Sequence, residues 1–196
     1  RIFEGLAVTG FALQLYGDSR PGSGAEHLIS HVLDMEGYLY RGEPVPHGFQ
    51  VAVGTVAVTR IMEYIAGLSA REAAAAAAPP ESRSEREINV ERLLSLQCYG
   101  NVKMTAMEKF LEDAAAQSRR ENIFQHWEAW KTMFLQQLIP SEKLIERLQY
   151  AGCPALPADI GLDPERFRHT LATAQLIRKR YTILDLLYEA GLLKSV

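Results

Sequence analysis

Several signals that identify large classes of protein are missing from this sequence. It has only two cysteines, Cys98 and Cys153, which stand far apart and form no CxxC pair. This excludes a cysteine-based zinc site and a disulfide-stapled secreted domain, and it suits reduced thiols in the cytoplasm. No apolar run approaches the roughly 18 residues that span a bilayer, and the first residues lack the layout of a signal peptide. We therefore expect a soluble, cytoplasmic protein.

A charge excess of one sign is also missing, because the net charge is only −3. Nucleic acid and anionic membrane surfaces attract basic patches, so we expect neither as a partner. No glycine-rich phosphate-binding loop of either common kind is present. With 196 residues and 47% hydrophobic content, the chain can still bury the core of one domain.

What the sequence does have is helical periodicity. Apolar residues recur at spacings of three and four along nearly the whole chain, whereas strict alternation is almost absent. The pattern predicts an all-α fold, a helix bundle. We expect helices over residues 1–16, 24–37, 47–67, 88–98, 102–117, 119–138, 141–151 and 163–180, and a last one after residue 182. Asp163 and Thr182 are predicted N-caps, and Gly191 is a predicted helix stop.

Residues 71–87 depart from this pattern. Six consecutive alanines lead into Pro79-Pro80 and then into alternating charges, a composition that allows one exposed helical turn but no packed core. We expect a mobile connector here. The chain also opens with Arg1 inside a predicted helix, so we expect a piece of a longer protein.

Three of the five histidines fall close together in the sequence. On a helix, His31 lies about 40° from His27 and Asp34 about 20° on the other side, so the three share one face. His47 follows Pro46 at the start of the next helix, where its side chain can point back across the corner. Imidazole nitrogens are preferred ligands of zinc and related divalent ions. The alternative is that an i, i+4 histidine pair is an incidental surface or core-edge feature.

The residues around the histidines favour a site. Gly22 and Gly24 allow close approach of the backbone, and Arg20 supplies a cation for an anionic substrate. The residues alone therefore predict a metal or polyanion site. Two other polar groups receive a structural interpretation: 178–180 (Arg-Lys-Arg) as a basic last turn that complements a helix dipole, and His126, among aromatic residues, as packing.

Two stretches of the chain resemble the glycerol-1-phosphate dehydrogenase family, within the superfamily of iron-containing alcohol dehydrogenases and dehydroquinate synthases. The first comprises SRPGSGAEH (19–27), SH (30–31), DM (34–35), PHG (46–48) and VGT (53–55). The second comprises GLD (161–163), IRKRYTILDLL (177–187) and GLL (191–193). These stretches lie near both ends, so the resemblance extends over the whole chain, and residues 70–150 match mainly by their helical pattern.

The resemblance implies a two-domain enzyme. An N-terminal α/β domain would bind NAD or NADP, so the resemblance implies no cofactor-binding residues in this chain. The chain, 1–196, would be the C-terminal helical domain that holds metal and substrate. His27 and His47 match two histidine ligands of a divalent metal (zinc, or nickel or iron), whereas the third ligand, an aspartate, would precede residue 1. Asp18 and Asp34 could replace it, but a turn suits Asp18 better, and a supporting contact to a histidine suits Asp34 better.

The resemblance also implies roles for other residues. His31 matches a histidine that contacts substrate and moves protons in the related dehydroquinate synthases, and its imidazole suits that catalytic role. Ser19, Arg20 and Ser23 are expected to hold substrate oxygens. Phe49 departs from the family, in which a polar or acidic residue often follows His-Gly, and this departure bears on substrate preference.

The implied reaction interconverts sn-glycerol 1-phosphate and dihydroxyacetone phosphate, a step of phospholipid metabolism. The implied partners are a polyol phosphate and the enzyme's own N-terminal domain, and we expect a homo-oligomer. On its own the chain should lack this activity and bind metal weakly. Alternatives are a glycerol dehydrogenase or a dehydroquinate-synthase-like enzyme, and, from another class, a stand-alone helical interaction module with incidental histidines.

Overall fold

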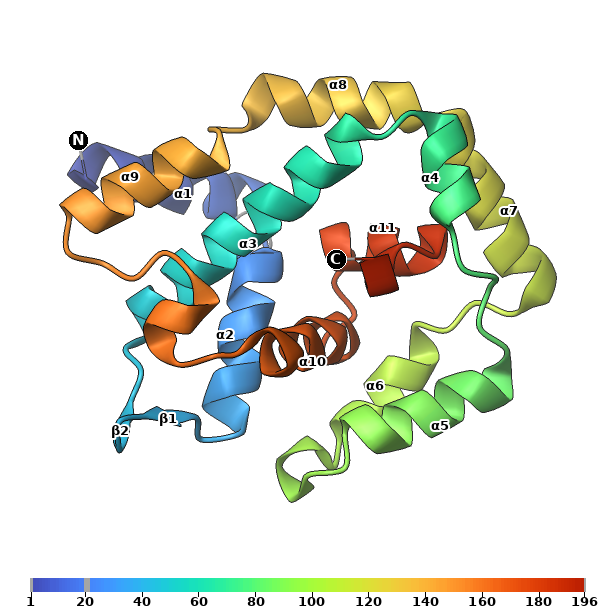
Figure 1. The fold of residues 1–196 in the computed structure, drawn as a ribbon, viewed down its shortest axis with the longest axis horizontal. Coiled ribbons are helices and arrows are strands. Elements are labelled where there is room, and N and C mark those ends of the chain that lie inside the picture. Colours follow the sequence, from blue (N-terminus) through green and yellow to red (C-terminus); the bar gives the residue numbers. More distant parts are fainter. Residues whose placement is uncertain (1, 20–21, 196) are drawn as a thin grey trace.

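The computed structural model describes residues 2–19 and 22–195, and helices make up most of them (Figure 1). The helices are α1 (Ile2–Tyr16), α2 (Ala25–Met35), α3 (His47–Gly67), α4 (Ala70–Ala76), α5 (Arg83–Leu93), α6 (Val102–Glu108), α7 (Asp113–Gln125), α8 (Trp127–Gln137), α9 (Ser141–Tyr150), α10 (Pro164–Leu176) and α11 (Ile183–Ala190). Two-residue strands β1 (Leu39–Tyr40) and β2 (Glu43–Pro44) form a small antiparallel hairpin. The predicted all-α bundle is confirmed.

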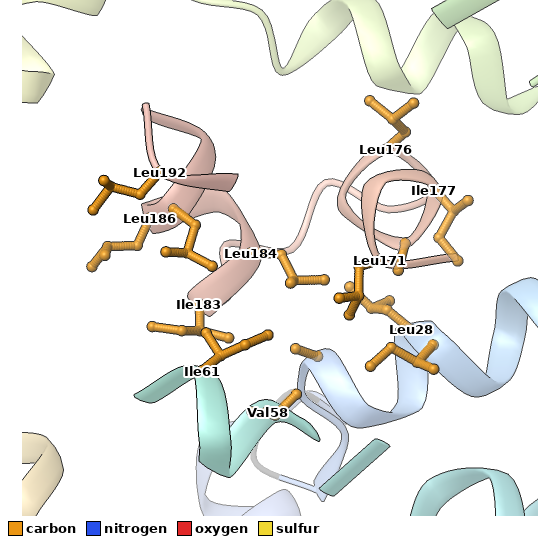
Figure 2. Close-up of a cluster of buried hydrophobic side chains, with 14 of the residues drawn as sticks. Leu28, Val58, Ile61, Leu171, Leu176, Ile177, Ile183, Leu184, Leu186 and Leu192 are labelled. Atoms are coloured by element: carbon orange, nitrogen blue, oxygen red, sulfur yellow. The ribbon is translucent and has the colours of Figure 1, made fainter. Parts of the chain in front are cut away.

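The core lies where α2 and α3 pack against α10 and α11. Leu28 of α2, Val58 and Ile61 of α3, Leu171 of α10 and Leu184 of α11 are buried together, as Figure 2 shows. Burial of such side chains stabilises each by about 1.5–3 kcal/mol relative to exposure. This core fixes α2 and the start of α3 relative to each other, and both carry the predicted site histidines.

A close approach of two helices depends on one glycine. A Cβ atom added to Gly54 of α3 would lie 2.8 Å from the backbone oxygen of Glu26 on α2. Only a residue without a Cβ fits between backbones at this distance. Gly54 therefore sets the spacing of α2 and α3 directly beside His27.

The remaining helices surround this core. In Figure 1, α4, α7 and α8 form an arc around α3 and α11, and α5 and α6 lie beside α10. The arc is anchored by Trp127 of α8, which is buried and donates its indole N–H to the backbone oxygen of Leu68 at 3.0 Å.

The helix boundaries agree with the sequence where a polar or special residue marks the end. Residues 47–67 form α3 as predicted, and Asp163 and Thr182 cap α10 and α11 through bonds to the backbone N–H groups of Arg166 and Leu184. Gly191 ends α11 in the left-handed conformation, with φ at 77°. These caps satisfy backbone groups that a helix end leaves unpaired.

The helix predicted over 88–98 is instead α5, Arg83–Leu93, which begins and ends five residues earlier. Three further predicted boundaries are wrong. The predicted helices over 102–117 and 119–138 are instead α6, α7 and α8, because the chain breaks before Asp113 and again at His126. His126 is exposed, and its Nδ1 lies 2.9 Å from the backbone oxygen of Asn122, so it ends α7 and is not core packing. The bend at this point lets Trp127 enter the core while α7 stays against α11.

The third error concerns the end of α10. This helix stops at Leu176, with Ile177 as its C-cap, so residues 178–180 follow the helix and do not form a basic last turn. The helix-dipole interpretation of these cations is therefore wrong. The loop that carries them runs toward the candidate site.

Residues 71–87 hold more structure than one exposed turn. They include most of α4 and the start of α5, and a Ser–Glu capping box opens each of these helices. Ala73 is fully buried, and the backbone N–H of Ala78 donates to the oxygen of Gly191 at 2.9 Å. Small alanine side chains let α4 pack closely, which a composition-based argument does not capture.

Within the described part of the chain, no single helix is both long enough and apolar enough to cross a membrane. Helices α3 and α4 meet the length and composition requirement only as a pair, and that pair is bent by 111°.

Candidate active site

Two histidines from different helices meet at one corner of the bundle. His27 lies in the first turn of α2, and His47 is the first residue of α3. The β1–β2 hairpin returns the chain to α2, and Pro46 turns it into α3. The two ring centroids are 5.5 Å apart, and the ring planes are tilted by 55°. The predicted convergence of these two rings is thus a feature of the structure.

In each of the two rings, Nδ1 makes a polar contact. Nδ1 of His27 lies 3.0 Å from Oε1 of Glu26, and Nδ1 of His47 lies 2.9 Å from Oγ of Ser30. Asp34 is farther away, with Oδ2 3.8 Å from Nδ1 of His47. In a histidine that binds a metal through Nε2, Nδ1–H commonly donates to such an oxygen. Nε2 is the nitrogen that each ring can offer to a ligand.

A buried network fixes the tautomer of His47. Gln50 is 3% exposed and donates its amide hydrogens to Oδ1 of Asp34 at 2.9 Å and to the oxygen of Val45 at 2.8 Å. Its Oε1 must then accept the hydroxyl hydrogen of Ser30, at 2.7 Å. Since Ser30 has only one hydrogen, its oxygen accepts from Nδ1–H of His47. Nε2 of His47 is therefore unprotonated, and its lone pair does not face Ser30.

His31 lies one turn after His27 on α2. Burial lowers the pKa of His31, and the positive charge of Arg178 lowers it further, while Asp34 opposes the shift. The imidazole is thus neutral at pH 7 and can accept a proton. Arg178 reaches this environment from the loop after α10.

The loop before α2 is tied to the same post-α10 segment. Arg180 donates to the backbone oxygen of Ser23, and its Nη2 lies 3.2 Å from Oγ of Ser19. The N–H of Gly24 donates to Oε1 of Glu26 at 2.7 Å, the carboxylate that also holds His27. Arg20, a predicted substrate-binding residue, lies outside the described residues.

The donor set fits a divalent metal only in part. His27 and His47 supply two imidazole nitrogens, and a catalytic zinc needs three protein ligands. Among the described residues, no group of three or more His, Cys, Asp or Glu side chains is arranged to hold a metal ion, so neither Asp18 nor Asp34 completes a site. Asp34 faces Nδ1 of His47 and accepts from Gln50, the position of a supporting group.

Sequence reasoning missed three residues of this corner, namely Glu26, Ser30 and Gln50. A signal for Ser30 was present, because at 100° per residue it lies about 60° from His27 on the face shared with Asp34. Gln50 carried no such signal, since its role depends on burial in the α2–α3 contact. Phe49, the residue that departs from the family pattern, is 37% exposed. Its side chain lines a shallow groove with Tyr40 and Ile160.

Comparison with known proteins finds relatives for part of the chain. It is 41% identical over 66 residues to the glycerol-1-phosphate dehydrogenase [NAD(P)+] of Korarchaeum cryptofilum, which is 34% of this chain and 20% of that protein. The enzyme of the same name from Archaeoglobus fulgidus is 48% identical over 64 residues, 33% of this chain and 16% of that protein. The one from Thermococcus sibiricus is 38% identical over 92 residues, 45% of this chain and 24% of that protein.

No family model and no solved structure matches the chain. The matched segments cover less than a quarter of these three relatives' lengths. Over these segments, the resemblance to glycerol-1-phosphate dehydrogenases that the sequence motifs indicated is confirmed.

Proposed function

We propose that this chain is the metal- and substrate-binding helical part of an NAD(P)-linked glycerol-1-phosphate dehydrogenase, which interconverts sn-glycerol 1-phosphate and dihydroxyacetone phosphate in the cytoplasm. The observation that carries the proposal is the pairing of His27 and His47, 5.5 Å apart between ring centroids, in a chain similar to enzymes of that name. An incidental pair on a helical module would not need a partly buried polar contact at Nδ1 of each ring.

In the proposed enzyme, Nε2 of His27 and of His47 hold a divalent metal together with a ligand from outside the described residues. A metal bound there supplies Lewis acidity toward the alcohol or ketone oxygen of the substrate. Glu26 and Ser30 orient the two rings through their Nδ1 atoms. Ser30 is held by its hydrogen bond to Gln50, and Gln50 is held by its hydrogen bond to Asp34.

His31 is the proposed proton acceptor. Its depressed pKa keeps the ring neutral, so it can take a proton from a bound hydroxyl group at pH 7. The substrate phosphate lies against the loop of Ser19, Arg20 and Ser23 in this proposal. Arg180 holds that loop through its contacts to Ser19 and Ser23.

The nicotinamide cofactor, NAD or NADP, binds mainly to another part of the proposed enzyme. Helix α1 offers a surface for that part or for a second subunit of a homo-oligomer, because most of its large apolar side chains are exposed. They are Phe3, Leu6, Val8, Phe11, Leu15 and Tyr16, with exposed fractions from 58% to 90%. A helix that is apolar on all sides is normally buried.

The test uses the longer enzyme of which we propose this chain to be a part. We expect His27→Ala and His47→Ala each to abolish oxidation of sn-glycerol 1-phosphate and to remove the divalent metal found by elemental analysis. His126→Ala, a histidine far from the pair in the fold, should retain both. Full metal content in the two site variants would contradict the proposal.

Parallel assays identify the substrate. Turnover of glycerol in place of glycerol 1-phosphate would favour a glycerol dehydrogenase, and turnover of a heptulosonate phosphate would favour a dehydroquinate-synthase-like enzyme. Either result would replace the proposed reaction while leaving the metal site in place.

A further inference from the structure

A second cleft lies between α5, α10 and α11, built from residues other than the histidine pair. Its volume is about 530 Å³, within the range of small-molecule sites. Leucines from these helices and from the C-terminal turn form much of its wall, and Pro79-Pro80 also lines it. The leucines are Leu93, Leu171, Leu176 and Leu193. The cleft can therefore hold an apolar body.

Cations from three segments also line this cleft. Arg86 and Arg92 come from α5, Arg168 from α10, and Lys194 from the C-terminal turn. Arg86 is 3% exposed and belongs to the inner wall, whereas Arg92 and Arg168 are exposed at the rim. The guanidinium groups thus extend from the inner wall to the mouth.

The carboxylates of the cleft are already engaged or peripheral. Glu81 accepts hydrogen bonds from Asn89 and from the hydroxyl of Tyr188, and Glu85 accepts from the backbone N–H of Ser82 in a capping box. Lys194 offsets part of the charge of Glu85. Glu165 is exposed in the first turn of α10, where it faces the positive end of the helix dipole.

Arg86 remains incompletely satisfied at the inner wall. Its Nη atoms donate to Oε1 of Gln175 and to the oxygen of Ala106, and its guanidinium lies 4.6 Å from the ring centroid of Tyr188. Glu81 approaches only to 3.8 Å. Within the described residues, Nε of Arg86 is buried and has no acceptor. Glu81 therefore offsets the positive charge of Arg86 only in part, and the remaining charge favours an anion in the cleft.

His169 lines the cleft from the α10 side. Burial lowers its pKa, and the charges of Arg166 and Arg92 lower it further. Arg92 stands on α5 and His169 on α10, so the field of one wall reaches the other across the cleft. Arg166 itself is paired with Glu36, which leaves Arg92 and Arg168 as the cations at the mouth.

We propose that this cleft binds a small organic phosphate, with the phosphate group between Arg92 and Arg168 and an apolar body against Leu171 and Leu176. Two guanidinium forks match the geometry of a phosphate dianion better than that of a monovalent carboxylate. The proposal is independent of the function assigned to His27 and His47.

Phenyl phosphate is the probe, because it joins one phosphate group to an apolar ring. We expect saturable binding by the 196-residue chain, followed by ¹H–¹⁵N NMR, with the largest amide shifts at Ala172, Leu176 and Gly191. Benzoate should bind more weakly, and neutral phenol should show no saturable shifts at these amides. Equal affinity for benzoate would overturn the phosphate assignment.

The matched variants are Arg92→Gln with Arg168→Gln, and Arg147→Gln as a control on α9. All three side chains are exposed, so folding should not depend on them. We expect the double variant to bind phenyl phosphate about tenfold or more weakly, since two charged hydrogen-bond donors are lost. The control should bind like the unchanged chain. An unchanged affinity in the double variant, or shifts confined to α1 or to the histidine corner, would overturn the proposal.

Discussion

At the scale of single residues, the state of His47 is decided by groups that never touch a ligand. Val45 and Asp34 use up both amide hydrogens of Gln50, so Gln50 must accept from Ser30, and Ser30 must accept from His47. This chain of donors leaves one tautomer with Nε2 available. A buried serine with no chemistry of its own thereby determines which nitrogen the site presents.

The variant Ser30→Ala tests this dependence. Removal of the hydroxyl takes away the acceptor for Nδ1–H of His47, so we expect the ring to populate both neutral tautomers in ¹⁵N imidazole shifts of the 196-residue chain. In the proposed longer enzyme, metal affinity should fall by about 10–100-fold, the usual effect of losing such a supporting group. Ser95→Ala, an exposed serine, is the control, and a single unchanged tautomer in Ser30→Ala would refute the argument.

The sequence identified the histidines that meet at this corner but not the side chains that contact them. Residue type identified His27, His31 and His47, because few other side chains have their chemistry. The contacts of Glu26 and Gln50 follow from burial at the crossing of two helices, which no local pattern encodes. Arg180 was assigned to a helix that in fact ends before it.

At the scale of elements, the contact between α2 and α3 controls both stability and the site. A Cβ atom on residue 54 would lie 2.8 Å from the backbone oxygen of Glu26 and 3.1 Å from its Cα. Neither helix backbone can move without disturbing His27, the next residue along α2. The glycine thus links the packing of the core to the position of one imidazole.

Gly54→Ala should therefore destabilise the chain, by about 1–3 kcal/mol in urea unfolding, as overpacking usually does. Gly67→Ala is the matched control in the same helix, since a Cβ there meets no atom within 4 Å. Alanine favours helix over glycine by up to about 1 kcal/mol, so the control should be neutral or stabilising. Equal effects at the two positions would show that the close approach does not matter.

Helix existence was predictable from periodicity, and helix breaks were not. Residues 47–67 carry one unbroken apolar pattern after Pro46, and they form α3. The same periodicity runs through His126, yet the chain bends there because Trp127 must enter the core. Tertiary burial decided this boundary, and a local pattern cannot weigh it.

At the scale of the whole molecule, α1 is the element least accounted for by the rest of the fold. Phe11 is 64% and Leu15 is 90% exposed, on a helix with few charges. Large exposed apolar side chains gathered on one element are typical of an interaction surface. We attribute it to the remainder of the proposed enzyme or to a second subunit.

The double variant Phe11→Ser, Leu15→Ser distinguishes a contact surface from a surface that stays exposed, because only a contact surface makes the substitutions destabilising in the longer enzyme. In the 196-residue chain we expect higher solubility and unchanged unfolding, since the side chains contact mainly water. In the longer enzyme the same changes should destabilise by about 2–5 kcal/mol, the cost of truncating buried apolar groups. Tyr150→Ser, at a residue 95% exposed on α9, should be neutral in both. If α1 stays exposed in the longer enzyme, all variants will be neutral there, and the nicotinamide-binding part must then pack on a different face of the helical bundle.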